Sequence, residues 1–283
     1  MDLNTLRQFF LKEISPVHGP GEAAAMFKEV CLHCSGRIFR HPLENIELTD
    51  AIQACIRDIT RKLATGMPLQ YALGYANFHH QRFMVNPDVL IPRPETEELL
   101  LWILEDYQDA PPKRILDVGT GSGCLAISLA GAFTEAIVYA LDVSQAALKV
   151  AQFNAGSLLG SADKIKWLHM DYLMQFPEHS FDLIVSNPPY ISYKNQHLVD
   201  PHVRMFEPET ALFAPGEDAL IFYRRLTKHL DVQEQCTLFT ELHSGTSEEV
   251  GLIFKNIPGI AEISLRSDFN GMMRMLRCIK KGN

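Results

Sequence analysis

From residue 114 to the end of the chain, segments with the period of β-strands alternate with segments with the period of helices. Short apolar runs such as Ile115–Val118, Ala136–Leu141 and Phe181–Val185 are typical of buried strands. Such alternation predicts an α/β fold, with a mostly parallel sheet covered by helices on both faces. Two final strands, Ile260–Leu265 and Met273–Ile279, are joined by so few residues that they are expected to pair antiparallel, because a parallel crossover needs about a dozen residues.

The first quarter of the chain has a different pattern. Over residues 3–66 apolar side chains recur every three or four positions, which predicts a small helical bundle. A short hairpin over residues 75–85 and a helix over residues 95–107 follow. We therefore expect three parts: a helical domain over residues 1–72, a hairpin connector over residues 73–94 and the sheet domain over residues 95–283.

Composition and charge disfavour several classes of function for this protein. A net charge of -8 disfavours a protein that wraps nucleic acid, because that binding draws on clustered Lys and Arg, and it suits a basic protein partner better. The sequence has no apolar run long enough to span a bilayer, and its start lacks the pattern of a secretion signal, so we expect a cytoplasmic protein. The six cysteines are scattered, and we expect them to be reduced thiols.

A glycine-rich loop follows the first strand of the sheet domain: Gly119-Thr120-Gly121-Ser122-Gly123. Alternate glycines let the backbone turn tightly and approach a ligand without an intervening side chain. The first strand-to-helix turn is where nucleotide-type ligands bind in this architecture. A dinucleotide fingerprint would have glycine at the next position, which is Cys124, so the loop alone does not indicate a nicotinamide enzyme.

Two aspartates accompany this loop. Asp142 ends the second strand, where a carboxylate can accept both hydroxyl hydrogens of a ribose. Asp117 precedes the loop and could face the amino group of an amino-acid moiety. The alternative for both residues is that they cap the helices that follow them.

The fourth strand ends in Asn187-Pro188-Pro189-Tyr190. Two prolines remove two backbone donors and fix two φ angles, so the carbonyl oxygens here stay free and rigidly aimed. An amide or exocyclic amino nitrogen presents two N–H donors in one plane. The side-chain oxygen of Asn187 and the carbonyl of Pro188 could accept both, and Tyr190 could stack on the flat target. The alternative is a proline-rich turn with a core tyrosine.

In these motifs the chain resembles the protein-(glutamine-N5) methyltransferases that act on peptide chain release factors. The resemblance is carried by GMPLQY at residues 66–71, VLIPRPETE at residues 89–97, the glycine loop, Asn187–Tyr190, and Glu207-Pro208 with Ala211-Leu212. Two segments depart from the family pattern: Glu241-Leu242-His243, where a glycine is usual after the glutamate, and Phe269–Met273, where a more charged segment is usual.

The resemblance implies a Rossmann-like sheet of seven strands, a helical N-terminal domain that recognises the substrate, and a β-hairpin connector. It implies transfer of a methyl group from S-adenosylmethionine, leaving S-adenosylhomocysteine, to the amide nitrogen of the glutamine in the Gly-Gly-Gln motif of class I release factors. It also implies that residues 119–123, Asp142 and Tyr172 contact the cofactor, that Asn187–Tyr190 receive the glutamine, and that Arg93 and Thr96 lie near the active site. We expect Asn187 to contact the cofactor as well, Arg93 and Thr96 to bind the substrate, and Asn187, Pro188 and Tyr190 to be catalytic. We expect a monomer that does not bind nucleic acid or membranes.

Other functions fit part of the sequence. Asn-Pro-Pro-Tyr is similar to the motif of adenine-N6 methyltransferases, which the acidic charge disfavours. A nicotinamide-dependent oxidoreductase would share the glycine loop but lacks an evident acid for hydride transfer, and a non-catalytic binding module would not need the rigid turn. Cys31 and Cys34 have the spacing of half a zinc site, but no second pair follows, so we expect no metal. Lys280 and Lys281 fit a solvated tail.

Overall fold

The computed structural model describes residues 2–36 and 48–282, and the chain forms two compact units. One unit consists of Met1–Tyr75 and Pro201–Phe206, and the other of Ala76–Asp200 and Glu207–Asn283. The predicted domain limits at residues 72 and 94 remain a prediction. Over the described ranges, no helix is long and apolar enough to cross a membrane.

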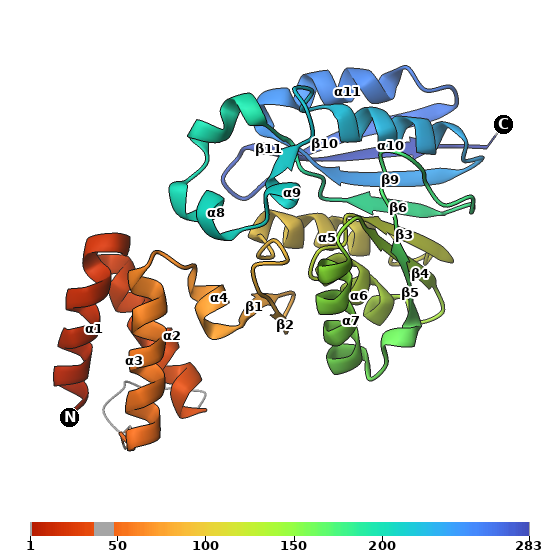
Figure 1. Cartoon of the computed structure of the whole chain (residues 1–283). Coiled ribbons are helices and arrows are strands. Elements are labelled where there is room, and N and C mark those ends of the chain that lie inside the picture. The colour runs from red at the N-terminus through yellow and green to blue at the C-terminus, as the bar shows by residue number, and fades with distance from the viewer. Residues whose placement is uncertain (1, 37–47, 283) are drawn as a thin grey trace. The chain divides into compact units, whose positions relative to one another are not determined.

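The first unit is helical, as predicted. Its helices are α1 (Leu3–His18), α2 (Pro20–Ser35), α3 (Asp50–Ala64), α4 (Leu69–Leu73) and α8 (Pro201–Phe206). Asp2 caps α1 by accepting a hydrogen bond from the backbone N–H of Thr5, and Thr49 caps α3 through the N–H of Ile52. The α1, α2 and α3 helices lie side by side (Figure 1). In the core between them the rings of Phe10 and Phe27 lie 5.3 Å apart.

The expectation of six reduced thiols is wrong for one pair. Cys34 at the end of α2 and Cys55 in α3 form a disulfide, with Cα atoms 5.8 Å apart. Cys34 therefore pairs across two helices and not with Cys31, which is a free, buried thiol. The positions of the cysteines in the sequence did not reveal this pair, because Cys34 and Cys55 come together only when α2 packs against α3.

Helix α8 comes from late in the chain but packs within the first unit. The ring of His202 stacks on the ring of His18, with centroids 5.9 Å apart, and lies against the backbone of Gly66. Gly66 has a φ of +85°, and a Cβ atom there would collide with the His202 ring. Glycine at residue 66 thus serves both the left-handed backbone and the close approach of α8.

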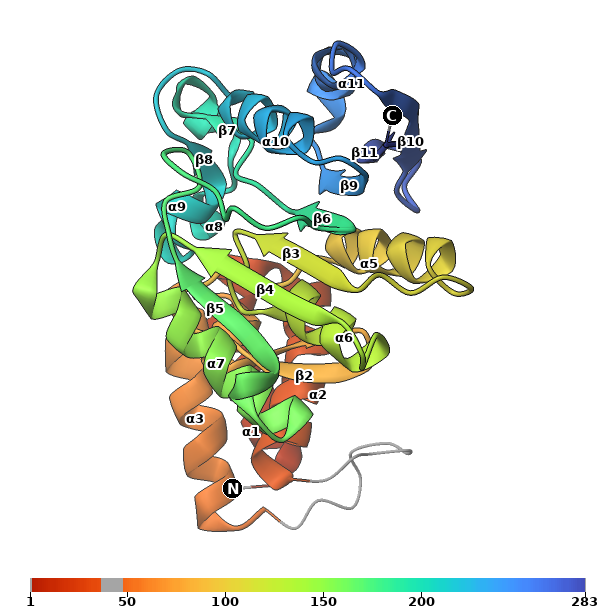
Figure 2. The same ribbon diagram turned by 90° about the vertical axis from the view of Figure 1, so that its right-hand side faces the viewer.

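The second unit contains the predicted parallel sheet with an antiparallel edge. The strands of the described part of this sheet are β3 (Arg114–Val118), β4 (Ile137–Asp142), β5 (Ile165–His169), β6 (Leu183–Ser186), β9 (Cys236–Glu241), β10 (Ile260–Ser267) and β11 (Met273–Lys280). Their order is β10-β11-β9-β6-β3-β4-β5 (Figure 2). Pairing from β9 to β5 is parallel, whereas β11 runs antiparallel to both β9 and β10.

Helices cover both faces of the sheet because successive strand residues point to opposite sides. Ile115 of β3 packs with α5 (Pro94–Asp106) and α6 (Cys124–Ala132), whereas the next residue, Leu116, packs with α10 (Ile221–Asp231) and α11 (Ser247–Lys255). Helix α7 (Gln145–Leu159) contributes Ala155 to the α5 side. The fold is that of a Rossmann-like sheet, confirming the prediction.

Smaller elements surround the sheet. The predicted hairpin is formed by β1 (Tyr75–Phe78) and β2 (Gln81–Met84), and a second two-stranded sheet by β7 (Ile191–Ser192) and β8 (Phe213–Ala214). The remaining short helices within residues 2–36 and 48–282 are η2 (Ala162–Lys164), η3 (Tyr193–Leu198), α9 (Glu209–Leu212) and η4 (Ser244–Thr246). The elements between residues 191 and 214 were not predicted from the sequence, because each is too short to show a period.

Lys280 does not belong to a solvated tail. It is the last residue of β11, is only 8% exposed, and its ammonium group donates hydrogen bonds to the carbonyl oxygens of Leu230 and Asp231. These carbonyls lie at the C-terminal end of α10, where a cation is stabilised by the helix dipole. Periodicity did not distinguish this buried lysine from a terminal charge.

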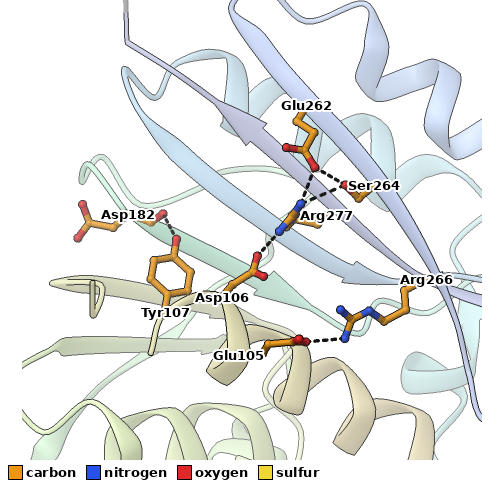
Figure 3. A network of polar contacts seen from close by, with 8 residues as sticks. All are labelled: Glu105, Asp106, Tyr107, Asp182, Glu262, Ser264, Arg266 and Arg277. Atoms are coloured by element: carbon orange, nitrogen blue, oxygen red, sulfur yellow. Dashed lines mark hydrogen bonds and ion pairs between the residues drawn. The ribbon is translucent and has the colours of Figure 1, made fainter. Parts of the chain in front are cut away.

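A polar network fastens the C-terminal half of α5 to the antiparallel edge (Figure 3). Arg277 of β11 binds Asp106 of α5 and Glu262 of β10, and Arg266 of β10 binds Glu105 of α5. Both arginines also lie over the ring of Trp102, at 5.5 Å and 4.5 Å. This network, together with the buried face of α5, holds the helix whose first turn reaches the site described next.

Candidate active site

The site lies where strand order reverses, at the carboxyl ends of β3 and β6. In such sheets this crevice is the usual place for ligands. A cavity of about 1020 Å³, counting the open solvent at its mouth, occupies the position. The predicted site residues that line it are Arg93, Thr96, Asp117, Gly119, Thr120, Gly121, Ser122, Asp142, Tyr172, Asn187, Pro188 and Pro189. The structure therefore brings together nearly all residues singled out from the sequence, although their individual roles remain predictions.

The three glycines of the loop after β3 have different structural roles. Gly119 and Gly121 have φ angles of +75° and +53°, and a Cβ atom on either would meet open space. Gly123 has a φ of +82°, but a Cβ atom there would lie 2.8 Å from the side chain of Ile127 and 3.1 Å from that of Ala151. The first two glycines thus leave the cavity floor bare, whereas Gly123 permits close packing of α6 on α7.

Asp117 is held by the loop that follows it. Its Oδ2 atom accepts hydrogen bonds from the hydroxyl of Thr120 at 2.7 Å and from the backbone N–H of Ala126 at 3.2 Å. The side chain is almost fully buried, and burial raises its pKa to about 7 against the lowering effect of these two bonds. The N-cap of α6 is Gly123, so Asp117 is not the cap proper, although it accepts from the first turn of this helix. Its place at the cavity wall agrees with facing a ligand amino group, which stays a prediction.

Asp142 joins the loop to the next helix. One carboxylate oxygen accepts from the backbone N–H of Gly121 at 2.9 Å, and the other from the N–H of Ser144 at 2.8 Å. The N-cap of α7 is Ser144, so Asp142 is not the cap proper. Burial is the main cause that raises the pKa of Asp142. Its place in the cavity wall agrees with ribose binding, which stays a prediction.

Tyr172 lines the cavity, and its hydroxyl is hydrogen-bonded to a buried histidine. The hydroxyl lies 3.0 Å from Nδ1 of His229, and the backbone carbonyl accepts from Nε of Arg225 at 2.7 Å. Burial lowers the pKa of His229 to about 4, so this ring is neutral at pH 7. Contact between Tyr172 and a ligand would therefore come from the ring face.

The Asn-Pro-Pro-Tyr segment divides into two parts. Asn187, Pro188 and Pro189 line the cavity. Tyr190 is not among the described lining residues, and its hydroxyl donates to Oε1 of Glu241 at 3.2 Å. Its ring lies 6.0 Å from that of His243. The predicted stacking of Tyr190 on a flat target is not tested by this arrangement.

Glu241 is a functional candidate that sequence reasoning did not assign. It ends β9, is 2% exposed, and accepts from the hydroxyl of Thr96 at 2.8 Å as well as from Tyr190. Thr96 in turn accepts from the side-chain N–H of Asn187 at 2.9 Å. Burial raises the pKa of Glu241 to about 7. Only the departure at residues 241–243 pointed to this position.

Arg93 has a structural partner. Its guanidinium forms an ion pair with the buried carboxylate of Glu207 at 2.5 Å, and Glu207 also accepts from the N–H of Ile91. This bond ties the loop before α5 to the loop before α9. Residues of the wall that the sequence did not single out as site residues include Asp88, Leu90, Val143, Met170, Asp171, Pro208, Thr210, Ala211 and Phe222.

Comparison with known sequences places the chain among methyltransferases. The methyltransferase small domain family matches residues 96–240. A release factor glutamine methyltransferase from Bacillus cereus is 35% identical over 81% of this chain and 82% of its own length. One from Bacteroides thetaiotaomicron is 36% identical over 80% and 81%, and one from Bacillus subtilis is 37% identical over 75% of both chains.

Among solved structures, a methyltransferase from Pyrococcus furiosus is similar in fold. It superimposes with a TM-score of 0.51 at 16% identity, covering 71% of this chain and 89% of that one. This likeness supports the architecture of the sheet unit.

Proposed function

This chain belongs to the family of release factor glutamine methyltransferases, and we propose that Asn187 and Pro188 hold the side-chain amide of the glutamine that it methylates. The reaction is transfer of a methyl group from S-adenosylmethionine to a glutamine of a peptide chain release factor. We further propose that the acceptor is the amide nitrogen in the Gly-Gly-Gln motif of class I factors. The observation that carries the site assignment is the shared cavity of the glycine loop and Asn187.

The residues at the cavity fit S-adenosylmethionine. Gly119 and Gly121 leave room where any side chain would project into the space, so the backbone can lie against a ligand. The carboxylates of Asp117 and Asp142 stand at the same wall, suited to an ammonium group and to ribose hydroxyls. When bound, the cofactor supplies a methyl group on a positively charged sulfur, which two nearby carboxylates would also favour electrostatically.

The protein contributes to catalysis by orienting the target amide and by accepting hydrogen bonds from its N–H groups. An amide nitrogen is a poor nucleophile because its lone pair is delocalised into the carbonyl. Asn187 Oδ1 and the Pro188 carbonyl accept its two N–H groups, which fixes the nitrogen and stabilises positive charge as it develops there. Pro189 cannot donate a backbone N–H, so it does not compete for these oxygens. Asn187, Pro188 and Tyr190 are thus the proposed catalytic set, and Arg93 holds the neighbouring loop.

The helical unit would recognise the release factor. It is built around its own core, and the net charge of -8 of the whole chain suits a partner with a basic surface. We propose that the protein acts as a monomer and does not bind nucleic acid directly. A pull-down of a release factor by the wild type but not by surface variants of α1–α3 would support this division of labour.

The decisive experiment is to incubate the protein with S-adenosylmethionine and a class I release factor and to locate added methyl groups by peptide mass spectrometry. One methyl group on the glutamine of Gly-Gly-Gln is the expected product. The same assay with double-stranded DNA and with RNA serves as the control. Methylated adenine without methylated glutamine would overturn the substrate and leave the chemistry of the site in place.

A further inference from the structure

Three elements meet behind Asn187. β6 and β9 are neighbouring parallel strands in register at Ser186 and Thr240, so Asn187, which follows β6, and Glu241, the last residue of β9, are neighbours at this edge of the sheet. The first turn of α5 places Thr96 between them: its hydroxyl lies 2.9 Å from Nδ2 of Asn187 and 2.8 Å from Oε2 of Glu241. The three side chains form one continuous chain of hydrogen bonds that ends at the cavity.

The buried carboxylate of Glu241 decides which group is the donor in each of these hydrogen bonds. Above its pKa of about 7 the carboxylate of Glu241 is ionised and only accepts hydrogen bonds, so the single hydroxyl hydrogen of Thr96 is donated to it. Thr96 then has only lone pairs to offer to Asn187, and the amide must turn its NH₂ group toward Thr96. The carbonyl oxygen of Asn187 is therefore left to face the cavity.

Building on the proposed function, we propose that Glu241, acting through Thr96, is a positioning residue that makes Asn187 present an oxygen and not an NH₂ group to the target amide. The two orientations of an asparagine amide have nearly the same shape, so packing alone does not choose between them. In the wrong orientation, donors of Asn187 would face donors of the target, and the target nitrogen would lose one of its two acceptors.

Burial increases the energetic preference for this orientation of the Asn187 amide. Thr96 is 3% exposed and Glu241 2%, so water does not replace either partner and an unmade bond costs the full desolvation of the group. Arg274 of β11 is the nearby cation that favours the ionised carboxylate, and Glu95 of α5 acts against it. The second oxygen of Glu241 accepts from Tyr190, so the same carboxylate steadies both ends of the Asn-Pro-Pro-Tyr segment.

The test compares two substitutions at Thr96. Thr96→Val keeps the shape but removes the hydroxyl, and Thr96→Ser keeps the hydroxyl. With a class I release factor as substrate, we expect kcat to fall about 10- to 100-fold in Thr96→Val and to stay within about threefold of wild type in Thr96→Ser. Calorimetric affinity for S-adenosylmethionine should be unchanged in both. Equal activity of wild type and Thr96→Val, or failure of serine to rescue, would overturn the proposal.

A matched control removes a comparable bond elsewhere. Thr60 in α3 is 1% exposed and donates its hydroxyl to the carbonyl of Ile56 at 2.6 Å. Thr60→Val should therefore cost stability without changing kcat. If Thr96→Val does not fold, Glu241→Gln replaces it: the neutral amide can serve Thr96 in either direction, so kcat should fall, and an unchanged kcat would overturn the proposal.

A measurement on the free protein separates this proposal from the proposed function. In a ¹⁵N–¹H spectrum the side-chain NH₂ of Asn187, assigned by its absence in Asn187→Ala, should exchange slowly with solvent in the wild type and rapidly in Thr96→Val. The same exchange rate in both proteins would overturn the positioning role even if the wild type methylates glutamine. Slow exchange in the wild type alone would support it even if the glutamine assay fails.

Discussion

Two buried carboxylates, Asp117 at the end of β3 and Glu241 at the end of β9, show how differently the two sides of the site are built. Burial raises the pKa of each to about 7. The partners of Asp117, Thr120 and Ala126, follow it within nine residues. Those of Glu241 come from 145 residues earlier, at Thr96, and 51 residues earlier, at Tyr190.

The loop of the cofactor side is thus part of one continuous strand, loop and helix, to which Asp142 and Tyr172 are added from later in the chain. The target side exists only once α5, β6 and β9 have packed. A change on the cofactor side should alter the affinity for S-adenosylmethionine, because the loop is the proposed contact surface for the cofactor. A change on the target side should alter the rate, because it moves the groups that aim the target amide. Four substitutions test this division.

The largest effect is expected from Asn187→Ala. Loss of a preorganised group at the reacting nitrogen should lower kcat by about 10³-fold. The affinity for S-adenosylmethionine should change by less than about threefold, because the glycine loop and Asp142 are untouched. Single-turnover methylation and calorimetry measure the two quantities. A parallel loss of affinity and rate would break the division between the two sides.

Asp142→Ala should do the reverse. Removing a carboxylate that accepts from Gly121 and would bind a ribose should weaken S-adenosylmethionine by about 10- to 100-fold. At saturating cofactor, kcat should remain within a few-fold of wild type. Asp142→Asn is the matched control, because it keeps an acceptor and should bind more tightly than the alanine variant. A lower kcat at saturation would contradict the assignment.

The pH dependence of the free energy of unfolding tests whether the carboxyls of Asp117 and Glu241 have raised pKa values. Each has a folded pKa of about 7, above its unfolded value, so each stabilises the fold when protonated, and this contribution is lost as the pH rises from about 4 to about 7. Asp117→Asn removes one contribution. The free energy of unfolding can be measured by urea unfolding without cofactor. The value for the wild type minus that for Asp117→Asn should fall by a few kcal/mol as the pH rises over this range. A constant difference would contradict the raised pKa.

Tyr190→Phe should have the smallest effect. It removes one of the two donors to Glu241 but leaves Thr96 in place, so the orientation of Asn187 survives. We expect a loss of about 1–2 kcal/mol in the free energy of unfolding and a fall in kcat that is smaller than in Thr96→Val. Thermal unfolding and the methylation assay measure these. A loss equal to that of Asn187→Ala would mean that the hydroxyl of Tyr190, and not only its ring, acts on the target.

The same contrast explains what the sequence could predict. The sheet, its antiparallel edge and the glycine loop follow from periods and turns within about ten residues, and the structure confirms the fold. The bond from Thr96 to Glu241, the disulfide between Cys34 and Cys55, and the hydroxyl of Tyr172 turned to His229 depend on residues that meet only after packing. Local patterns carry no record of such partners.

The packing of α8 with the N-terminal helices has a consequence for how this protein can be rearranged. The chain passes between the two units at three places, after Tyr75, after Asp200 and after Phe206. A recombination event at one junction would replace residues 1–75 and leave α8 to meet foreign helices at Gly66 and His18. Among relatives, residues 201–206 are therefore expected to change together with the N-terminal region and not with the sheet that surrounds them in sequence.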